Sequence, residues 1–425
     1  MKILWVVNKL TGKLHVKING CKSTGGLWLE AMIEAVKKDP DINIVIVNIG
    51  GVKDIRVLED DNVKYYTIPG KANEHYDYKS EQSHIYWRQI IEEEKPDIIE
   101  LWGTEMPIGL AVLEEAHNIP AVVYVQGILE SIGRYYQAGM SDYELHMATT
   151  LRDVFTHSTI KQVQKRYLKR STYEKTIVNK AKNIIVENNW AEAYYRKVCP
   201  DVNVYRCPLS ISKEFETSRW NWDTMKQHTL MCSAANYPIK GLHMLLKALH
   251  IVKKYYPDIK LYIPGTVLRN TTHLNDRLKE KGYEKFIHYL IENLDLKQNV
   301  FYTGRLTAVK MAEQMCMSNC FVMCSAIENH STTLKEAMTT GVPCVASFVG
   351  GIPEYARDME NCLLYRFEDY EMLAFNIMSL FKNKDLCQKI SENAVADMTY
   401  NRNTYDFYEI SKNIYADIIK RGCKE

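Results

Sequence analysis

Two glutamates eight residues apart, Glu328 and Glu336, are the residues of this 425-residue chain best suited to chemistry. They lie in a segment where a short apolar run, residues 320–324, leads into a polar loop and then into a helical pattern. At the carboxyl end of a strand in an open α/β sheet, the first turn of the next helix presents backbone N–H groups that bind anions. A carboxylate accepts hydrogen bonds from sugar hydroxyls. The pattern therefore suits a ligand that carries both a sugar and a diphosphate.

Other interpretations of the same two residues remain open at this point. Thr333 and Glu336 have the spacing of a capping box, in which Glu336 would only satisfy backbone N–H groups at the helix start. Glu328 alone is typical of a solvated loop acid. The spacing does not decide between these alternatives, so the decision depends on the neighbouring residues.

Lys240 and a glycine pair are further candidates for contact with an anion. Lys240 lies just before a helical pattern, where a compact positive charge suits a phosphate, although a solvated first-turn lysine is the alternative. Asn8 ends the first apolar run, and Gly25 and Gly26 lead into the helix expected from residue 27. Glycines at such a place let the backbone approach a ligand closely.

Composition sets the class of protein. Hydrophobic residues make up 46% of the chain and charged residues 25%, which is typical of a soluble globular protein. The net charge of +2 gives no overall attraction to nucleic acid. Eleven scattered cysteines without a CxxC pair predict a reducing, cytoplasmic setting, and Cys316, Cys320 and Cys324 are interpreted as packed thiols and not as metal ligands. No apolar run reaches the ~20 residues of a membrane-spanning helix.

Short β-branched runs alternate with longer amphipathic stretches, the pattern of parallel βαβ units. The pattern restarts after a polar connector around residues 214–227, so a chain of this length is expected to form two α/β domains. Strands are expected at residues 3–7, 42–47, 64–68, 97–101, 121–125 and 183–186, and again at 230–233, 260–263, 300–302, 320–324, 343–346 and 362–365. Helices are expected at residues 27–38, 86–94, 242–255 and 404–419.

The segment from residue 325 to residue 354 resembles the donor-binding signature of retaining glycosyltransferases of family 4, which have the GT-B fold. That signature is a Glu-x7-Glu pair, an Ala-Met helix, Gly-x-Pro, a strand and Gly-Gly-x-Pro-Glu. Here its parts are Glu328, Glu336, Ala337-Met338, Gly341-Val342-Pro343, Val345-Ala346-Ser347 and Gly350-Gly351-Ile352-Pro353-Glu354. The resemblance implies that Glu328 contacts the donor sugar and Glu336 the nucleotide ribose. The residues expected to lie against sugar and phosphate are Asn329, His330, Ser331, Thr332, Thr333 and Leu334.

The family's other elements are matched in part. Lys240-Gly241 resembles the element whose lysine contacts the diphosphate, but the arginine that the family places five residues earlier is Ala235 here. Asn236 follows Ala235 and is included in the expected donor site, and Arg305 is a candidate substitute for the missing arginine. Gly25 and Gly26 resemble the family's glycine loop facing the phosphates.

Gln126 stands where many relatives have a histidine near the reacting sugar carbon. Glutamine does not titrate, so the leaving phosphate is expected to take the acceptor's proton. The catalytic residues implied by the resemblance are Glu328, Lys240 and Gln126.

The resemblance implies two Rossmann-like domains that face a central cleft, with a C-terminal helix crossing back to the first domain. The expected domains are residues 1–210 together with 404–425, on the acceptor side, and residues 211–403, on the donor side. The implied activity is retaining transfer of a hexose-type sugar from a nucleoside diphosphate to a glycan or lipid-linked acceptor in surface polysaccharide synthesis, without a metal or cofactor. A sugar-nucleotide epimerase and a non-catalytic binding protein of the same fold are the alternatives.

Residues 161–182 contain eight Lys or Arg and a single acid, Glu174. This basic stretch is either a solvated helix face or a surface that contacts anionic lipid headgroups. The second interpretation predicts a peripheral contact with the inner face of a membrane. Glu100 and Glu105 either orient the acceptor or are surface carboxylates.

Overall fold

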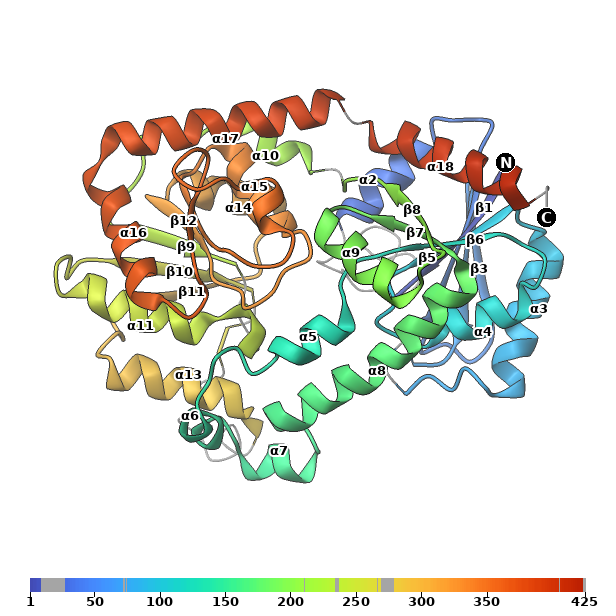
Figure 1. Ribbon diagram of the computed structural model, residues 1–425, viewed down its shortest axis with the longest axis horizontal. Coiled ribbons are helices and arrows are strands. Elements are labelled where there is room, and N and C mark those ends of the chain that lie inside the picture. Colours follow the sequence, from blue (N-terminus) through green and yellow to red (C-terminus); the bar gives the residue numbers. More distant parts are fainter. Residues whose placement is uncertain are drawn as a thin grey trace. The chain divides into compact units, whose positions relative to one another are not determined.

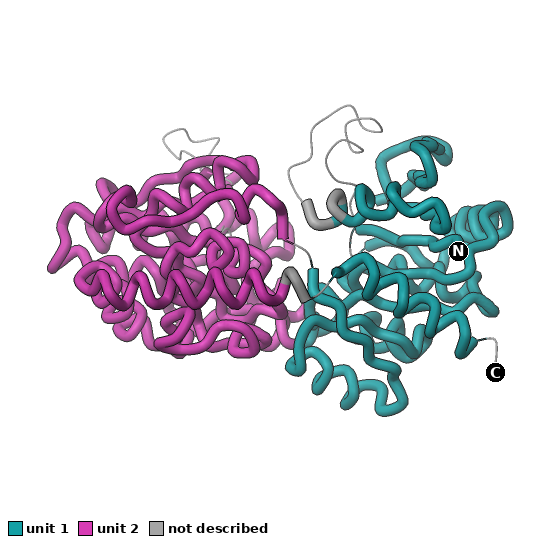
Figure 2. Tube along the Cα trace, turned by 90° about the horizontal axis from the view of Figure 1, so that it is seen from above, with its two compact units in different colours: residues 1–130, 168–210, 405–425 teal, residues 131–167, 211–404 magenta. Residues whose placement is uncertain are grey.

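The computed structural model describes residues 1–8, 27–71, 73, 75–209, 211–233, 237–265, 267–268, 279–404 and 406–422 (Figure 1). The chain divides into two compact units (Figure 2). Unit 1 contains residues 1–130, 168–210 and 405–425, and unit 2 contains residues 131–167 and 211–404. Residues 131–167 thus pack with unit 2, and the domain boundary near residue 210 stays a prediction.

Unit 1 is built on one eight-stranded sheet with the order β3-β4-β2-β1-β5-β6-β7-β8. Its strands are β1 (Lys2–Val7), β2 (Asn43–Gly50), β3 (Arg56–Asp60), β4 (Val63–Pro69), β5 (Ile98–Trp102), β6 (Ala121–Tyr124), β7 (Asn183–Val186) and β8 (Asn203–Arg206). All neighbouring pairs are parallel except β3 with β4. The strand order reverses between β1 and β5, which is where an open α/β sheet binds its ligands.

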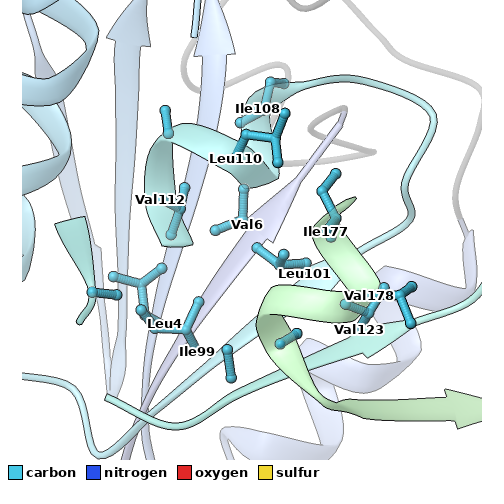
Figure 3. Packing of buried hydrophobic residues seen from close by; sticks show 14 of the residues in the cluster. Leu4, Val6, Ile99, Leu101, Ile108, Leu110, Val112, Val123, Ile177 and Val178 are labelled. Carbon is cyan, nitrogen blue, oxygen red and sulfur yellow. The ribbon is translucent and has the colours of Figure 1, made fainter. Parts of the chain in front are cut away.

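Side chains of β1 alternate between two apolar cores, one on each face of this sheet. Leu4 and Val6 belong to one core, which also contains residues of α4 (Ile108–Glu115) and α8 (Ile160–Ala181), as Figure 3 shows. Ile3, Trp5 and Val7 belong to the other. Both faces are therefore covered, as a parallel sheet requires.

The remaining helices of unit 1 complete these two layers. They are α2 (Leu27–Val36), α3 (Glu81–Glu94), α5 (Leu129–Tyr135), α9 (Asn189–Val198) and α18 (Phe407–Gly422). Two helices are divided between the units: residues 129–130 of α5 and residues 168–181 of α8 belong to unit 1, and the rest of both helices belongs to unit 2.

The C-terminal helix α18 belongs to unit 1, as the fold prediction required. Its residues Phe407, Ile414 and Ile418 join the core that contains Trp5. The hydroxyl of Tyr415 donates a hydrogen bond to the Glu100 carboxylate at 2.5 Å. Glu100 is 1% exposed and is covered by α18, so the interpretation of this residue as a surface carboxylate was wrong.

Unit 2 contains a six-stranded, fully parallel sheet with the order β11-β10-β9-β12-β13-β14. Its strands are β9 (Thr229–Cys232), β10 (Lys260–Pro264), β11 (Val300–Gly304), β12 (Cys320–Met323), β13 (Cys344–Ser347) and β14 (Leu363–Tyr365). The order reverses between β9 and β12. The predicted α/β class with two Rossmann-like sheets is confirmed.

Helices of unit 2 include two short ones from the segment 131–167. The helices are α6 (Asp142–Met147), α7 (Leu151–Phe155), α10 (Lys213–Thr217), α11 (Leu242–Lys253), α13 (Gly282–Asn293), α14 (Ala308–Cys316), α15 (Thr332–Thr340), α16 (Tyr370–Lys382) and α17 (Lys384–Thr404). The segment 131–167 is tied to the rest of unit 2 by the buried ring of His243, whose Nε2 donates a hydrogen bond to the Ala138 carbonyl and whose Nδ1 accepts one from the Tyr283 hydroxyl. Cys320 and Cys324 are buried and Cys316 half-buried, as free thiols.

Each strand expected from the sequence is present, with ends displaced by at most three residues. The strands β3 and β8 were not expected, and both lie at an edge of their sheet. Edge strands face solvent and carry few buried apolar residues, so they lack the signal on which the prediction depended. Over the described residues, none of the helices has the length and apolar character needed to cross a bilayer.

Replacing Tyr415 by Phe should destabilise the protein, and more so at high pH. Burial raises the pKa of Glu100 to about 8, and the Tyr415 hydroxyl opposes this shift. A carboxyl whose folded pKa lies above its unfolded value contributes most stability at low pH and loses that contribution as pH rises through 8. Without the hydroxyl, the ionised form loses a donor, so we expect a loss of about 1–3 kcal/mol at pH 9 and less at pH 6.

Urea unfolding at the two pH values measures this difference. Tyr400→Phe is the matched control, because Tyr400 is 68% exposed and should change little. An equal loss at both pH values would show that the hydroxyl does not act on the charge of Glu100.

Candidate functional site

Lys240 and Glu328 meet at the carboxyl edge of the unit 2 sheet, where the strand order reverses. Lys240 ends a short 3-10 turn, η1 (Pro238–Lys240), on the chain that follows β9, and Glu328 lies in the loop after β12. Their side chains form an ion pair with Nζ–Oε1 at 2.5 Å. The Ser325 hydroxyl donates to the same carboxylate oxygen at 2.6 Å. Two residues that are 88 positions apart are thus brought together at the place that topology favours for a ligand.

Both side chains of this pair are largely covered, with 24% of Lys240 and 13% of Glu328 exposed. Burial disfavours the ammonium, but the neighbouring Glu328 carboxylate outweighs it and raises the pKa of Lys240 above its usual value. Lys240 therefore carries its positive charge at every physiological pH.

Gly241 explains how the Lys240 turn can lie so close to β12. Its φ is 70°, and a Cβ atom at this residue would lie 1.7 Å from the Cys324 carbonyl oxygen. Two bonds hold the contact: Ala326 N–H donates to the Ile239 carbonyl at 2.7 Å, and the Cys324 thiol donates to the Lys240 carbonyl at 3.3 Å. Only glycine combines this backbone conformation with this separation.

A second close approach comes from the loop after β13. Gly350 has a φ of 52°, and a Cβ atom there would lie 1.9 Å from the Glu328 carbonyl oxygen. Gly351 N–H donates to the same carbonyl at 3.2 Å, and the Ser347 hydroxyl donates to the Ser325 carbonyl at 2.6 Å. The loop that contains Glu328 is therefore held by the neighbouring loops on both sides.

Helix α15 begins at Thr332, and Ser331 is the residue that caps it. The Ser331 hydroxyl oxygen accepts from Leu334 N–H at 3.3 Å. Glu336 is the fifth residue of the helix and lies beyond the position of a capping-box glutamate, so the capping-box alternative was wrong. The remaining first-turn residues Thr332 and Thr333 place their amides at the helix start, where backbone N–H groups lack intrahelical acceptors.

Glu336 differs from an ordinary helix glutamate. It is half-buried, and desolvation raises the pKa of its carboxyl to about 8. Among the described residues, no hydrogen bond or ion pair to its side chain occurs. A carboxylate in this state gains most from a ligand that supplies hydroxyl donors.

His330 and Asn329 lie between Glu328 and the helix. The His330 ring packs edge-on against Tyr355 with centroids 4.8 Å apart, and its Nδ1 lies 3.0 Å from Lys335 Nζ. The Tyr355 hydroxyl donates to the Ser331 carbonyl at 3.3 Å. These contacts fix the backbone of the turn, and Asn329 is buried within it.

Gly25, Gly26 and Asn236 lie outside the described residues. Arg305 follows β11, two strands away from β9 in the sheet, which places its backbone about 10 Å from the strand that leads to Lys240.

The unit 1 sheet has its own cluster at the reversal between β1 and β5. The Asn8 amide donates to the Glu105 carboxylate at 2.9 Å and to the Trp102 carbonyl at 3.3 Å. Glu105 is half-buried, and desolvation raises the pKa of its carboxyl. Gln126 lies directly after β6, in the next loop along the same edge.

Glu174 is a residue whose role sequence reasoning missed. It is 0% exposed and accepts hydrogen bonds from the hydroxyls of Thr104 and Tyr195, both at 2.9 Å, and from Leu129 N–H at 3.1 Å. Burial raises the pKa of its carboxyl to about 7. By joining the loop after β5 to the loop after β6, Glu174 positions the chain that contains Gln126. The sequence signal that could have pointed to this role is that Glu174 is the single acid within a basic helix.

The C-terminal part of the chain matches a protein family. Residues 212–397 match the family described as "Glycosyl transferases group 1". The chain is 28% identical over 131 residues to the N-acetyl-alpha-D-glucosaminyl L-malate synthase of Bacillus anthracis, covering 31% of this chain and 34% of that protein. It is 25% identical over 156 residues to spore coat protein SA of Bacillus subtilis, covering 36% and 39%. The matches thus span less than half the length of these relatives.

Solved structures are similar over nearly the whole chain. Sucrose-phosphate synthase from Thermosynechococcus elongatus has a TM-score of 0.74 at 16% identity, covering 99% of this chain and all of that one. HepE from Anabaena, in complex with UDP and glucose, has a TM-score of 0.64 at 15% identity, covering 98% of this chain and 99% of that one. Together with the two parallel sheets, these similarities show that the chain has the GT-B fold, and residues 212–397, which contain the signature from Glu328 to Glu354, match the glycosyl transferases group 1 family.

Proposed function

We propose that this protein is a retaining glycosyltransferase that moves a hexose-type sugar from a nucleoside-diphosphate sugar to a glycan or lipid-linked acceptor. The observation that carries the proposal is the Lys240–Glu328 pair at the strand-order reversal, beside the start of α15 and the Glu336 carboxyl, which has no partner among the described residues. A cation, a helix start and two carboxylates are complementary to a diphosphate, a sugar and a ribose.

The roles follow from the hydrogen-bonding capacity of each group. The Lys240 ammonium has three donors, so it can keep one on Glu328 and offer others to the diphosphate. The Glu328 carboxylate uses one oxygen for Lys240 and Ser325, which leaves the other for sugar hydroxyls. Glu336 accepts from the ribose diol. The backbone from Asn329 through His330 and Ser331 to Leu334 lies against the sugar and the diphosphate of the donor substrate.

UDP is the nucleotide that the comparisons favour. The Anabaena HepE structures contain UDP with glucose, or UDP-glucose, and a trehalose-6-phosphate structure from E. coli contains UDP-2-fluoro glucose. These proteins share the fold of this chain, so their ligands support a UDP-sugar as the donor.

In the proposed reaction the bond between the sugar C1 and the diphosphate oxygen breaks, and an acceptor oxygen forms the new bond on the same face. The departing diphosphate takes the acceptor's proton. Lys240 stabilises the charge that develops on the diphosphate, which is the main catalytic contribution expected here. Gln126 orients the reacting groups by hydrogen bonding and transfers no proton.

We further propose that the acceptor belongs to surface polysaccharide synthesis and that the protein works in the cytoplasm beside the inner face of a membrane. One relative is named a spore coat protein, which supports a surface product. Four of the eight basic residues between 161 and 182, which were predicted to contact lipid, form ion pairs with acids of the protein. The pairs are Lys161–Asp142, Lys175–Glu130, Lys180–Glu114 and Lys182–Asp201.

Replacing Glu336 or Lys240 by Ala should remove most of the stabilisation that a donor nucleotide gives. We expect UDP or a UDP-sugar to raise the melting temperature of the wild type. Losing one ribose or phosphate partner should weaken binding by about 10-fold to 100-fold, because hydrogen bonds to charged groups contribute about 1.5–3 kcal/mol. Thermal-shift titration against a panel of nucleoside diphosphates and their sugars measures this.

Glu313→Ala is the control, because Glu313 is an exposed acid on α14 of the same unit. An unchanged response in Glu336→Ala would refute the ribose role. Release of UDP with an acceptor extract separates the transferase from its alternatives: an epimerase converts the donor without acceptor, and a binding protein releases no diphosphate.

Nucleotide affinity should also rise with pH, and Glu336 should be the cause. Desolvation raises the pKa of its carboxyl to about 8, so the free site holds a proton at neutral pH. Ribose hydroxyls donate to the ionised form and favour it, so binding releases that proton. UDP affinity should then increase by up to about tenfold per pH unit below pH 8 and level off above it.

Isothermal titration of the wild type and Glu336→Gln between pH 6.5 and about 9 measures the slope. Titration of the UDP phosphate contributes equally to both proteins and cancels in the comparison. The same slope in both would exclude Glu336 as the titrating group.

A further inference from the structure

Helix α7 presents an apolar face to solvent. Leu151 is 78% exposed, Val154 49% and Phe155 81%. At positions i, i+3 and i+4 of one helix these side chains lie on the same face. Figure 1 shows α7 leading directly into the long helix α8. Large apolar side chains that are this exposed and this close together mark a contact surface.

Helix α7 is held in place by hydrogen bonds at its start and by contacts with α13. Thr150 and Asp153 form a capping box at the start of α7. The Asp153 carboxylate also accepts from Gly282 N–H at 2.7 Å, at the beginning of α13. A Cβ atom on Gly282 would lie 2.0 Å from the Ala148 carbonyl oxygen, so the chain there is as close as glycine permits. All of these residues belong to unit 2.

The surroundings of this face are positively charged. Residues 146–170 contain six Lys or Arg and one acid, Asp153, and the acids just before this stretch, Asp142 and Glu144, pair with Lys161 and Lys247. Asp153 is 3% exposed, and its carboxylate accepts from Thr150 and Gly282 and pairs with Arg152. Lys165 and Lys169 are exposed on the next turns of α8, and Lys161 pairs at 2.8 Å with the exposed Asp142.

We propose that α7 and the first turns of α8 form a membrane-docking surface. Leu151, Val154 and Phe155 enter the interfacial layer of a bilayer, and Lys165 and Lys169 contact anionic headgroups. Exposed apolar groups flanked by lysines are the combination that binds anionic bilayers. Three side chains on a five-residue helix fall far short of the ~20–30 residues a side of a stable protein interface, which argues against a second copy as the occupant.

This inference rests on the proposed function, since a lipid-linked acceptor requires access to a membrane, and it moves the contact from residues 161–182 to residues 151–169. The basic charge further along α8 is largely used by the acids of unit 1. Docking does not involve the nucleotide site, so the two can be tested separately.

Flotation of the full chain with phosphatidylcholine vesicles, with and without phosphatidylglycerol, tests the proposal. We expect binding to the anionic vesicles that weakens as salt is added. L151S/F155S should lower the affinity by at least tenfold, because burial of each apolar CH2 contributes about 0.8 kcal/mol. K165E/K169E should lower it at low salt and remove most of the salt dependence.

M372S/F375S is the matched control, because Met372 and Phe375 on α16 are also exposed, at 44% and 59%, and should leave vesicle binding unchanged. Each variant is first shown to keep the thermal response to UDP, so a failure of docking is distinct from a failure of the nucleotide site. No binding to anionic vesicles, or equal binding by L151S/F155S, would overturn the proposal. A dimer in light scattering that disappears in L151S/F155S would assign the face to a second copy, and would overturn it too.

Discussion

The candidate site depends on one steric constraint, the approach of the Gly241 backbone to the carbonyl oxygen of Cys324. At this separation no side chain fits, and the positive φ of Gly241 turns the chain into α11. The turn before it therefore lies directly against the end of β12, and Lys240 comes within 2.5 Å of Glu328. On the other side of the Glu328 loop, the Gly350 backbone makes a second approach of this kind, to the carbonyl oxygen of Glu328. Lys240 and Glu328 can form their ion pair because the glycines lack Cβ atoms, which lets the neighbouring backbone segments come into contact.

Most of the fold could be predicted because its strands are buried on both faces. Runs such as β2 and β12 are almost continuously apolar, which a parallel sheet between two helical layers requires. The edge strands β3 and β8 carry the polar sequences RVLED and NVYR and could not be recognised in this way. Their pairing is set by the neighbouring strand, which a local pattern does not contain.

At the candidate site, the sequence indicated which residues would lie near one another more readily than what each side chain would contact. The order of the signature brought Lys240, Glu328 and the start of α15 to one sheet edge, as the topology shows. Local patterns were less informative for burial. Glu100 and Glu105 resembled surface acids, and Glu174 resembled part of a solvated helix, yet tertiary packing buries Glu100 and Glu174 and half-buries Glu105. Burial depends on residues distant in sequence, such as Tyr415 for Glu100 and Tyr195 for Glu174.

The buried carboxyls of unit 1 show why Glu336 is different. Burial raises the pKa of Glu100 and of Glu174, and each receives hydroxyl donors from the protein itself, as a covered carboxyl should. Glu336 has a pKa raised to the same extent as that of Glu100, yet the described residues offer it no donor. Glu336 lies on the helix next to Glu328, and the ribose role proposed above supplies the hydroxyl donors that the described residues do not. Two adjacent hydroxyls on one rigid ring, as in a ribose, meet that requirement with the least loss of freedom.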